Sequence, residues 1–220
     1  MSRGADAPAA SPSLRIAHRL PLTEAEGPGR RYALWVQGCA LRCPGCCNRE
    51  LFDPGGGAAL PVAALAAELV AAAREHDLDG LTVVGGEPLE QLAGVAALAE
   101  AAQAVELGVI VFTGYTWDEA RALPGFDRLF AALDTLVSGR FDAGRREPTV
   151  GGRRFIGSTN QRLHHRSARY ADPERWAGPA ALELRVAADG TIALSGDPAM
   201  SRRVLPVLRG QDRGGRPRAT

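Results

Sequence analysis

All four cysteines of this 220-residue chain lie in one short segment, between Cys39 and Cys47. Cysteines that form disulfides are usually spread along a sequence, because each bridge ties together distant elements. Thiols gathered on one loop are instead typical of a metal or redox site. The segment therefore predicts a metal or redox centre and argues against a disulfide-bonded fold.

The rest of the sequence predicts one compact domain between two tails. The hydrophobic fraction of 45% is ample for a core, and the length suits a single domain of roughly 100–200 residues. Residues 1–13 and 210–220 are rich in Ala, Pro, Ser, Gly or Arg and are predicted to be disordered tails. The domain is predicted to span residues 14–209.

Composition also excludes several classes of partner. No apolar run reaches the roughly 18–20 residues that a membrane span needs, and no secretory signal is visible, so we expect a cytoplasmic protein. Every one of the 26 basic residues is Arg, but 25 acidic residues are interspersed and the net charge is +1. This balance does not predict a nucleic-acid-binding face.

Short apolar strands alternate with amphipathic helices through the middle of the chain, which predicts a parallel sheet of right-handed βαβ units. The predicted strands are Arg31–Val36, Leu81–Val84, Gly108–Thr113 and Thr135–Val137, and the predicted helices are Pro61–His76, Pro88–Val105, a helix after the N-cap Thr116, and Phe126–Leu133. Near the C-terminus, Asp189-Gly190 predicts a β-hairpin turn, and a last helix is predicted over Ala199–Leu208.

The length of the core limits the architecture. A full eight-fold barrel takes about 250 residues, so an α/β fold with a partial barrel or an open sheet is favoured. In such folds the carboxyl ends of the strands carry the active site. Here those ends bring together Cys39–Cys47, Gly85–Pro88 and Thr113–Tyr115.

The cysteine spacing is Cys39-x3-Cys43-x2-Cys46, followed directly by Cys47. Three thiolates on one loop suit three irons of a [4Fe–4S] cluster and leave the fourth iron open. Cys47 is not expected to be the fourth ligand, because neighbouring side chains on an extended loop diverge. A structural zinc site, which normally needs a second ligand pair, and inert thiols are the alternatives.

At this point the sequence resembles a known family. The segment WVQGCALRCPGCCNRELFD is similar to the cluster loop of radical S-adenosylmethionine (SAM) enzymes, and most closely to the small activating enzymes of glycyl-radical enzymes such as anaerobic ribonucleotide reductase. Further similar segments follow in the expected order between Arg31 and Ser195, namely VVGGEPLEQ, FTGYTWDE, DTLVSGRFD and GSTNQRL.

The resemblance implies a fold, cofactors and site residues. The fold would be a partial (β/α)6-type radical SAM barrel with a small C-terminal β-hairpin extension. Cys39, Cys43 and Cys46 would bind the [4Fe–4S] cluster. The cofactor-binding residues for SAM would be Gly45, Cys47, Gly85, Gly86, Glu87 and Thr113. Cys47 stands where the family usually carries an aromatic residue, and Gly45 stands where other radical SAM branches carry one but activases of this type often have glycine. No catalytic residue is predicted.

The implied activity is that of a radical SAM oxidoreductase, which reductively cleaves SAM to a 5′-deoxyadenosyl radical. The partners would be a glycyl-radical enzyme as protein substrate, and a flavodoxin or ferredoxin as electron donor. An alternative is a radical SAM enzyme that acts on a peptide or small metabolite. An alternative of another class is a structural metal-binding module.

Three features have simpler interpretations as well. Gly85–Pro88 is also consistent with an ordinary turn between a strand and a helix, in which Glu87 favours the helix N-terminus. Asn160 could cap local backbone. The pair His164-His165 stands among arginines and is predicted to lie on a solvated, positively charged surface.

Overall fold

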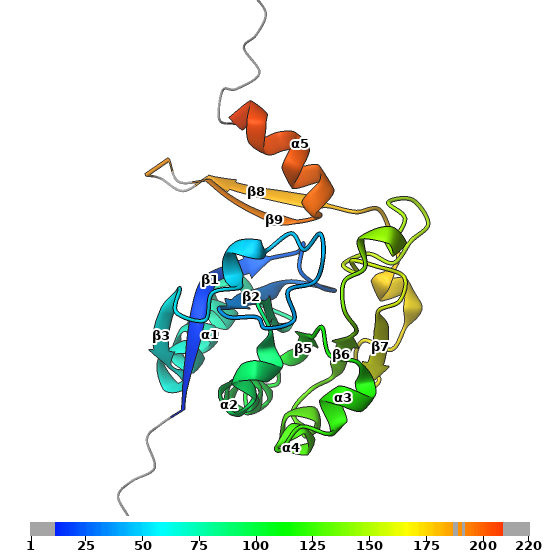
Figure 1. Ribbon diagram of the computed structural model, residues 1–220. Helices are drawn as coiled ribbons and strands as arrows, with labels where there is room; N and C mark the ends of the chain where they lie inside the picture. Colours follow the sequence, from blue (N-terminus) through cyan, green and yellow to red (C-terminus); the bar gives the residue numbers. More distant parts are fainter. Residues whose placement is uncertain (1–11, 187–188, 191, 209–220) are drawn as a thin grey trace, which may run out of the picture.

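The computed structural model describes residues 12–186, 189–190 and 192–208, with helices packed on a central sheet (Figure 1). Residues 1–11 and 209–220, which hold nearly all of both predicted tails, lie outside the described residues. Ser13 already belongs to the first strand, one residue before the predicted domain boundary.

The sheet has seven strands in the order β3-β1-β2-β4-β5-β6-β7. Its four central strands are parallel, as predicted, whereas β1 and β3 at one edge and β7 at the other pair antiparallel. The three antiparallel strands are the ones that were not among the predicted strands. The strands are β1 (Ser13–Thr23), β2 (Arg31–Val36), β3 (Ala58–Pro61), β4 (Gly80–Gly85), β5 (Gly108–Phe112), β6 (Thr135–Ser138) and β7 (Arg162–His165).

Helices cover one face of this sheet and enclose the larger core. Leu65 and Leu69 of the first helix are buried against strand residues such as Leu34. The helices are α1 (Val62–His76), α2 (Leu92–Gln103), α3 (Trp117–Arg121) and α4 (Phe126–Ala131), with short 3₁₀ turns η1 (Arg49–Leu51), η2 (Pro88–Gln91), η3 (Ala143–Arg145) and η4 (Pro173–Trp176). Thr116 caps α3 as predicted, in a reciprocal capping box with Glu119.

The opposite face carries a second core cluster. Ile110 and Val137 point from β5 and β6 into it, and Ile156, Tyr170 and Trp176 close over them from the chain after β6. Arg31 is fully buried at the amino-terminal end of β2, where its Nε donates to Thr82 Oγ1 at 3.0 Å and its guanidinium contacts Tyr170. This face is therefore filled near the amino-terminal ends of the strands.

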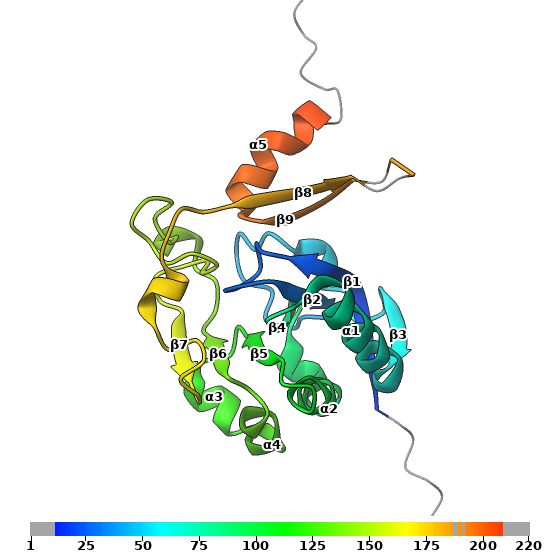
Figure 2. The ribbon, with the colours of Figure 1, turned by 180° about the vertical axis from the view of Figure 1, so that it is seen from behind.

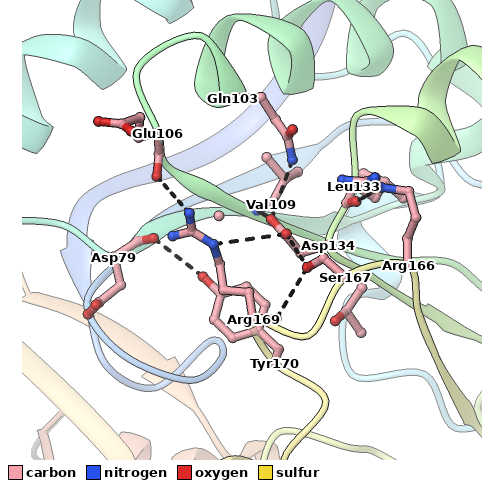
Figure 3. A network of polar contacts seen from close by, with 12 residues as sticks. Asp79, Gln103, Glu106, Val109, Leu133, Asp134, Arg166, Ser167, Arg169 and Tyr170 are labelled. Atoms are coloured by element: carbon pink, nitrogen blue, oxygen red, sulfur yellow. Dashed lines mark hydrogen bonds and ion pairs between the residues drawn. The ribbon is translucent and has the colours of Figure 1, made fainter.

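A polar network seals that same end of the sheet (Figure 3). The carboxylate of Asp134 accepts hydrogen bonds from the backbone N–H of Val109 at 2.8 Å and from the Ser167 hydroxyl at 2.5 Å. Arg169 and Tyr170 come from the segment after β7, and the Tyr170 hydroxyl donates to the carbonyl of Asp79 at 3.3 Å. Because the amino-terminal end is sealed, the carboxyl end of the sheet is left for the site.

The two neighbouring histidines of β7 do not form the solvated surface predicted from their arginine neighbours. Ser138 Oγ lies 2.8 Å from His164 Nε2, Thr135 Oγ1 lies 2.9 Å from His165 Nδ1, and the His164 ring stacks on Trp117. Burial lowers the pKa of both rings. They pair with β6 hydroxyls and hold the edge strand in register, so this prediction is wrong.

The C-terminal part is a separate antiparallel hairpin of β8 (Leu182–Val186) and β9 (Ile192–Gly196), followed by α5 (Pro198–Leu208). In Figures 1 and 2 these elements lie across the sheet from α2, α3 and α4. Glu183 fixes the hairpin by accepting from the hydroxyl of Thr23 and the N–H of Glu24. None of the described helices is both long and apolar enough to cross a membrane.

Candidate metal centre

The loop that carries the cysteines leaves the carboxyl end of β2 and is closed by hydrogen bonds at its base. Gly38 N–H donates to the carbonyl of Leu51 at 2.9 Å, and Gln37 Nε2 donates to the carbonyl of Asp53 at 2.7 Å. The loop is also tied to the turn after β4, because Glu87 N–H donates to the carbonyl of Gly38 at 2.7 Å. The first ligand position is thus anchored to two neighbouring parallel strands.

The three predicted ligands, Cys39, Cys43 and Cys46, are each partly buried on this loop. A tight turn brings the last two together, since Cys46 N–H donates to the carbonyl of Cys43 at 3.1 Å. Burial raises the pKa of Cys39 and of Cys43, and hydrogen bonds from backbone N–H groups oppose this rise. These N–H groups belong to Arg42 and Leu41 for the first thiol and to Phe141 for the second.

The thiol of Cys47 donates a hydrogen bond to Cys46, which lowers the pKa of Cys46 and raises that of Cys47. The sequence-based expectation that these neighbours diverge is therefore wrong in this structure. Cys47 remains the exposed member of the set, while the other three are partly buried. Cys47 therefore differs from the three candidate ligands in two ways, because it is exposed and its thiol donates a hydrogen bond to a neighbouring thiol.

Gly45 lies on the side of the loop that faces the chain after β6. Its φ of +75° favours glycine, and a Cβ at this position would come within 2.9 Å of the Ala143 side chain. The loop therefore packs against η3, and an aromatic residue here would not fit. This steric requirement explains the glycine without any reference to a cofactor.

Glu87 and Thr113 join the ends of β4 and β5 in a buried hydrogen-bond network. Glu87 Oε1 accepts from the Thr113 hydroxyl at 2.7 Å and from Leu89 N–H at 2.9 Å, while Oε2 accepts from Gly114 N–H at 2.8 Å. Burial raises the pKa of Glu87 to about 7, against the opposing effect of these hydrogen bonds. Both predicted cofactor residues are thus already partnered within the protein.

Gly85 and Gly86 form the turn that separates β4 from this network. Gly85 is the last residue of β4 and pairs with Val36 of β2. Gly86 packs so closely on the cysteine loop that a Cβ would lie 2.1 Å from the carbonyl oxygen of Gly38. The glycine is required here by contact between two backbone segments of the chain.

The donor set fits an iron–sulfur cluster. Each of the three thiols accepts at least one backbone N–H hydrogen bond, the third from Asn48. Thiolates are the usual ligands of such clusters, and hydrogen bonds to the sulfur atoms tune their potential. In the described part of the chain, no three His, Cys, Asp or Glu side chains, these cysteines included, gather closely enough to hold a single metal ion. A cluster has a different requirement, because each thiolate binds its own iron.

Two further contacts to the loop escape sequence reasoning. Glu90 Oε1 accepts the N–H of Ala40 at 2.7 Å, and the positive charge of Arg140 lies near enough to Cys43 to favour its thiolate. Both residues stand inside segments that resemble the family, VVGGEPLEQ and DTLVSGRFD. Their place inside these segments was the only sequence signal for the two contacts. Glu90 lies about 50 positions from Ala40, and Arg140 lies about 100 positions from Cys43, so no local pattern could show either contact.

Comparison with known proteins gives concordant matches. The sequence profile of a family described as "4Fe-4S single cluster domain" matches residues 25–164, which include the whole cysteine loop. A protein of Enterobacteria phage T4, named anaerobic ribonucleoside-triphosphate reductase-activating protein, is 28% identical over 148 residues, which are 65% of this chain and 88% of the relative.

Proteins of the same name from two bacteria are similar to the same extent. The Salmonella typhi protein is 28% identical over 158 residues, covering 69% of this chain and 99% of the relative. The Escherichia coli (strain K12) protein is 28% identical over 151 residues, covering 66% of this chain and 94% of the relative.

Proposed function

The chain belongs to the 4Fe-4S single cluster domain family, and from this membership we propose that Cys39, Cys43 and Cys46 bind one [4Fe–4S] cluster that serves SAM cleavage. The observation that carries the proposal is the coincidence of two findings. The family match covers the three-cysteine loop, and each thiol on that loop accepts a backbone N–H hydrogen bond.

When bound, the reduced cluster would supply the electron that cleaves the S–C5′ bond of SAM, giving methionine and a 5′-deoxyadenosyl radical. The residues of this chain hold the cysteine loop in place. Cys39, Cys43 and Cys46 would hold the cluster from one loop, and a cluster held by three thiolates would keep one iron available to SAM. The hydrogen bond from Glu87 N–H to Gly38 fixes this loop against β4, and the Glu87–Thr113 bond fixes β4 against β5.

The radical acts on a partner protein in this proposal. The relatives are named as activating proteins of anaerobic ribonucleoside-triphosphate reductase, and the chain covers nearly their whole length. We therefore take a glycyl-radical enzyme such as that reductase as the substrate, and a flavodoxin or ferredoxin as electron donor. A cytoplasmic setting and a partial (β/α)6 barrel built on β2, β4, β5 and β6 complete the proposal.

Anaerobic reconstitution with iron and sulfide, followed by incubation with SAM and dithionite, tests the first part. We expect about four irons per chain and formation of 5′-deoxyadenosine, with neither in Cys43→Ala. A wild-type protein that holds a cluster but forms no more 5′-deoxyadenosine than the Cys43→Ala control would refute SAM cleavage. One zinc per chain in place of iron would support a structural metal-binding module.

The choice of substrate is tested separately. The reconstituted protein is mixed with SAM, dithionite and an anaerobic ribonucleotide reductase, and the reductase is examined by electron paramagnetic resonance. A glycyl-radical signal is the expected result. Formation of 5′-deoxyadenosine without that signal would exclude this reductase as the substrate and leave a peptide or a small metabolite as the alternative.

A further inference from the structure

Two stretches of this sequence are strongly basic, residues 140–162 and residues 202–218, and the first lies wholly within the described residues. Residues 140–162 hold six arginines and only two acidic residues, Asp142 and Glu147, although the whole chain has a formal charge of only +1. The remaining sequence must therefore be slightly acidic. Such local asymmetry creates a surface field that attracts negatively charged partners.

Part of this segment encloses a polar cavity of about 460 Å³, which we call the arginine cavity. It is lined by Arg145, Arg153 and Arg162 together with the stretch 159–163, and by no acidic side chain. Arg153 is paired with Glu147, at 2.9 Å between Nη2 and Oε2. Arg145 and Arg162 are exposed and have no carboxylate partner among the described residues.

The arginine cavity adjoins the cysteine loop through a continuous set of contacts. Arg145 ends η3, whose first residue, Ala143, faces Gly45 of the loop. On the other wall, Asn160 Nδ2 donates to the carbonyl of Arg140 at 2.8 Å. The next residue along, Phe141, gives its backbone N–H to the thiol of Cys43. Residues that line the arginine cavity are thus joined by direct contacts to the backbone that holds a candidate cluster ligand.

We propose that the arginine cavity, with Arg145 and Arg162 as its principal charges, is the docking surface for an acidic protein electron donor. This proposal rests on the proposed function, because only a cluster that is reduced during turnover needs a donor. Each docking event transfers one electron from the reduced donor to the cluster, and one cleavage of SAM consumes that electron. The donor leaves oxidised by one electron.

The character of the surface suits a donor that binds briefly. Exposed charges steer diffusional encounter and raise the association rate more than they raise affinity. Such interactions are screened at ordinary ionic strength, where the Debye length is about 8 Å. A donor that must dock and leave at every turnover is served by this kind of surface. A glycyl-radical enzyme that inserts a chain segment beside the cofactor needs a longer-lived contact.

The test uses the reconstituted protein and an acidic flavodoxin as the probe. In Arg145→Glu/Arg162→Glu both exposed charges are reversed, and the matched control is Arg74→Glu, an exposed arginine of α1 on the helix-covered face. We expect the double variant to bind flavodoxin roughly tenfold or more weakly at low salt, and the control to bind as the wild type does. Wild-type affinity should also fall with added salt.

Measurements of turnover distinguish the docking proposal from the proposal of SAM cleavage on which it rests. With dithionite, the double variant should form 5′-deoxyadenosine at the wild-type rate, whereas with reduced flavodoxin its rate should fall roughly tenfold. Failure of the wild type with dithionite would refute SAM cleavage itself. Wild-type behaviour of the double variant with flavodoxin, or no flavodoxin binding by the wild type, would overturn the docking surface alone.

A third result would reassign the surface. If the double variant keeps flavodoxin binding but loses binding of the anaerobic reductase, the arginine cavity serves the protein substrate and the proposal is overturned in that direction. Circular dichroism and iron content, measured first, show whether the double variant is folded and loaded. Both substituted side chains are exposed, so we expect both measurements to match the wild type.

Discussion

Glu87 and Thr113 stand 26 residues apart and meet at the carboxyl ends of β4 and β5, where Glu87 Oε1 accepts the Thr113 hydroxyl at 2.7 Å. Only 1% of the surface of Glu87 is exposed. Its other acceptor sites are used by Leu89 N–H and Gly114 N–H. A single carboxylate thus holds together the two turns that flank the candidate metal centre, and it acts first as a positioning residue.

Glu87→Ala should destabilise the fold strongly. The substitution leaves the Thr113 hydroxyl and two backbone N–H groups without an acceptor in a buried place, and each such loss costs about 1–3 kcal/mol. Removal of the buried carboxyl also removes its own desolvation cost, which offsets part of this loss. We therefore expect a total loss of roughly 2–4 kcal/mol in the free energy of unfolding, measured by urea denaturation. Glu75→Ala, at an exposed site on α1, is the control. A change below 1 kcal/mol for Glu87→Ala would show that the network is dispensable.

Gly86→Ala should disturb the metal centre through the fold. The added Cβ would lie 2.1 Å from the Gly38 carbonyl oxygen, so the cysteine loop or the turn after β4 has to move. We expect lower iron content after reconstitution and a lower melting temperature. In Gly55→Ala the new methyl meets only the flexible Asp53 side chain, at 3.3 Å, so both quantities should stay near wild type.

The same variant distinguishes two reasons for the glycine. The family resemblance implies that this turn lies against SAM, which would make SAM binding the property that fails. If Gly86→Ala keeps its full iron content and thermal stability but loses SAM affinity, contact with the cofactor is the dominant reason. In that case the backbone around Gly38 can shift to make room for the added methyl group without loss of stability.

The central strands and their helices could be predicted because their patterns are local. Runs such as Leu81–Val84 are apolar throughout, and Thr116 with Glu119 is a capping signal three residues long. β1 escaped prediction because His18 and Arg19 are exposed polar residues in its middle and Pro21 follows them, so the strand has no clear apolar pattern. β7 is only four residues long, and its half-buried histidines are held by partners on β6.

In the candidate site, too, the features that depend on a local pattern could be predicted and the contacts between distant segments could not. The three proposed cysteine ligands follow from spacing on one loop, so the sequence suffices to propose them. The contacts of Glu90 with Ala40 and of Arg140 with Cys43 depend on how β4 and β6 are arranged around the loop. A pattern within one segment carries no information on such pairings. The closeness of Cys46 and Cys47 was missed because the loop turns sharply after Cys43 and is not extended.

The four cysteines should separate into two classes. Alanine at Cys39, Cys43 or Cys46 is expected to abolish cluster assembly, because each removes one of three ligands on a single loop. Cys47→Ala should retain the cluster, since this exposed thiol only donates a hydrogen bond to Cys46. Iron and acid-labile sulfide per chain after anaerobic reconstitution measure the effect. Equal loss of iron in Cys47→Ala would mean four protein ligands and no open iron for SAM.

Glu26 should make the fold less stable as the pH rises. Its Oε1 accepts Gly196 N–H at 2.7 Å under the C-terminal hairpin. Burial raises its pKa from 4.5 to about 7, and the nearby Glu183 on β8 adds to the rise. Between pH 4.5 and pH 7 the folded chain therefore binds a proton that the unfolded chain has released. The free energy of unfolding must fall across that window.

Glu26→Gln isolates this contribution, because glutamine can accept the same hydrogen bond and stays neutral. Glu87 titrates in the same window and direction, but it does so equally in both proteins. The Glu26 side chain is only partly shielded, so we expect about 1–2 kcal/mol rather than the full linkage value. In urea denaturation the variant should match the wild type at pH 4.5 and exceed its stability by that amount at pH 8. A constant difference between the two proteins at every pH would instead mean that the pKa of Glu26 is the same in the folded and the unfolded chain, so that burial does not shift it.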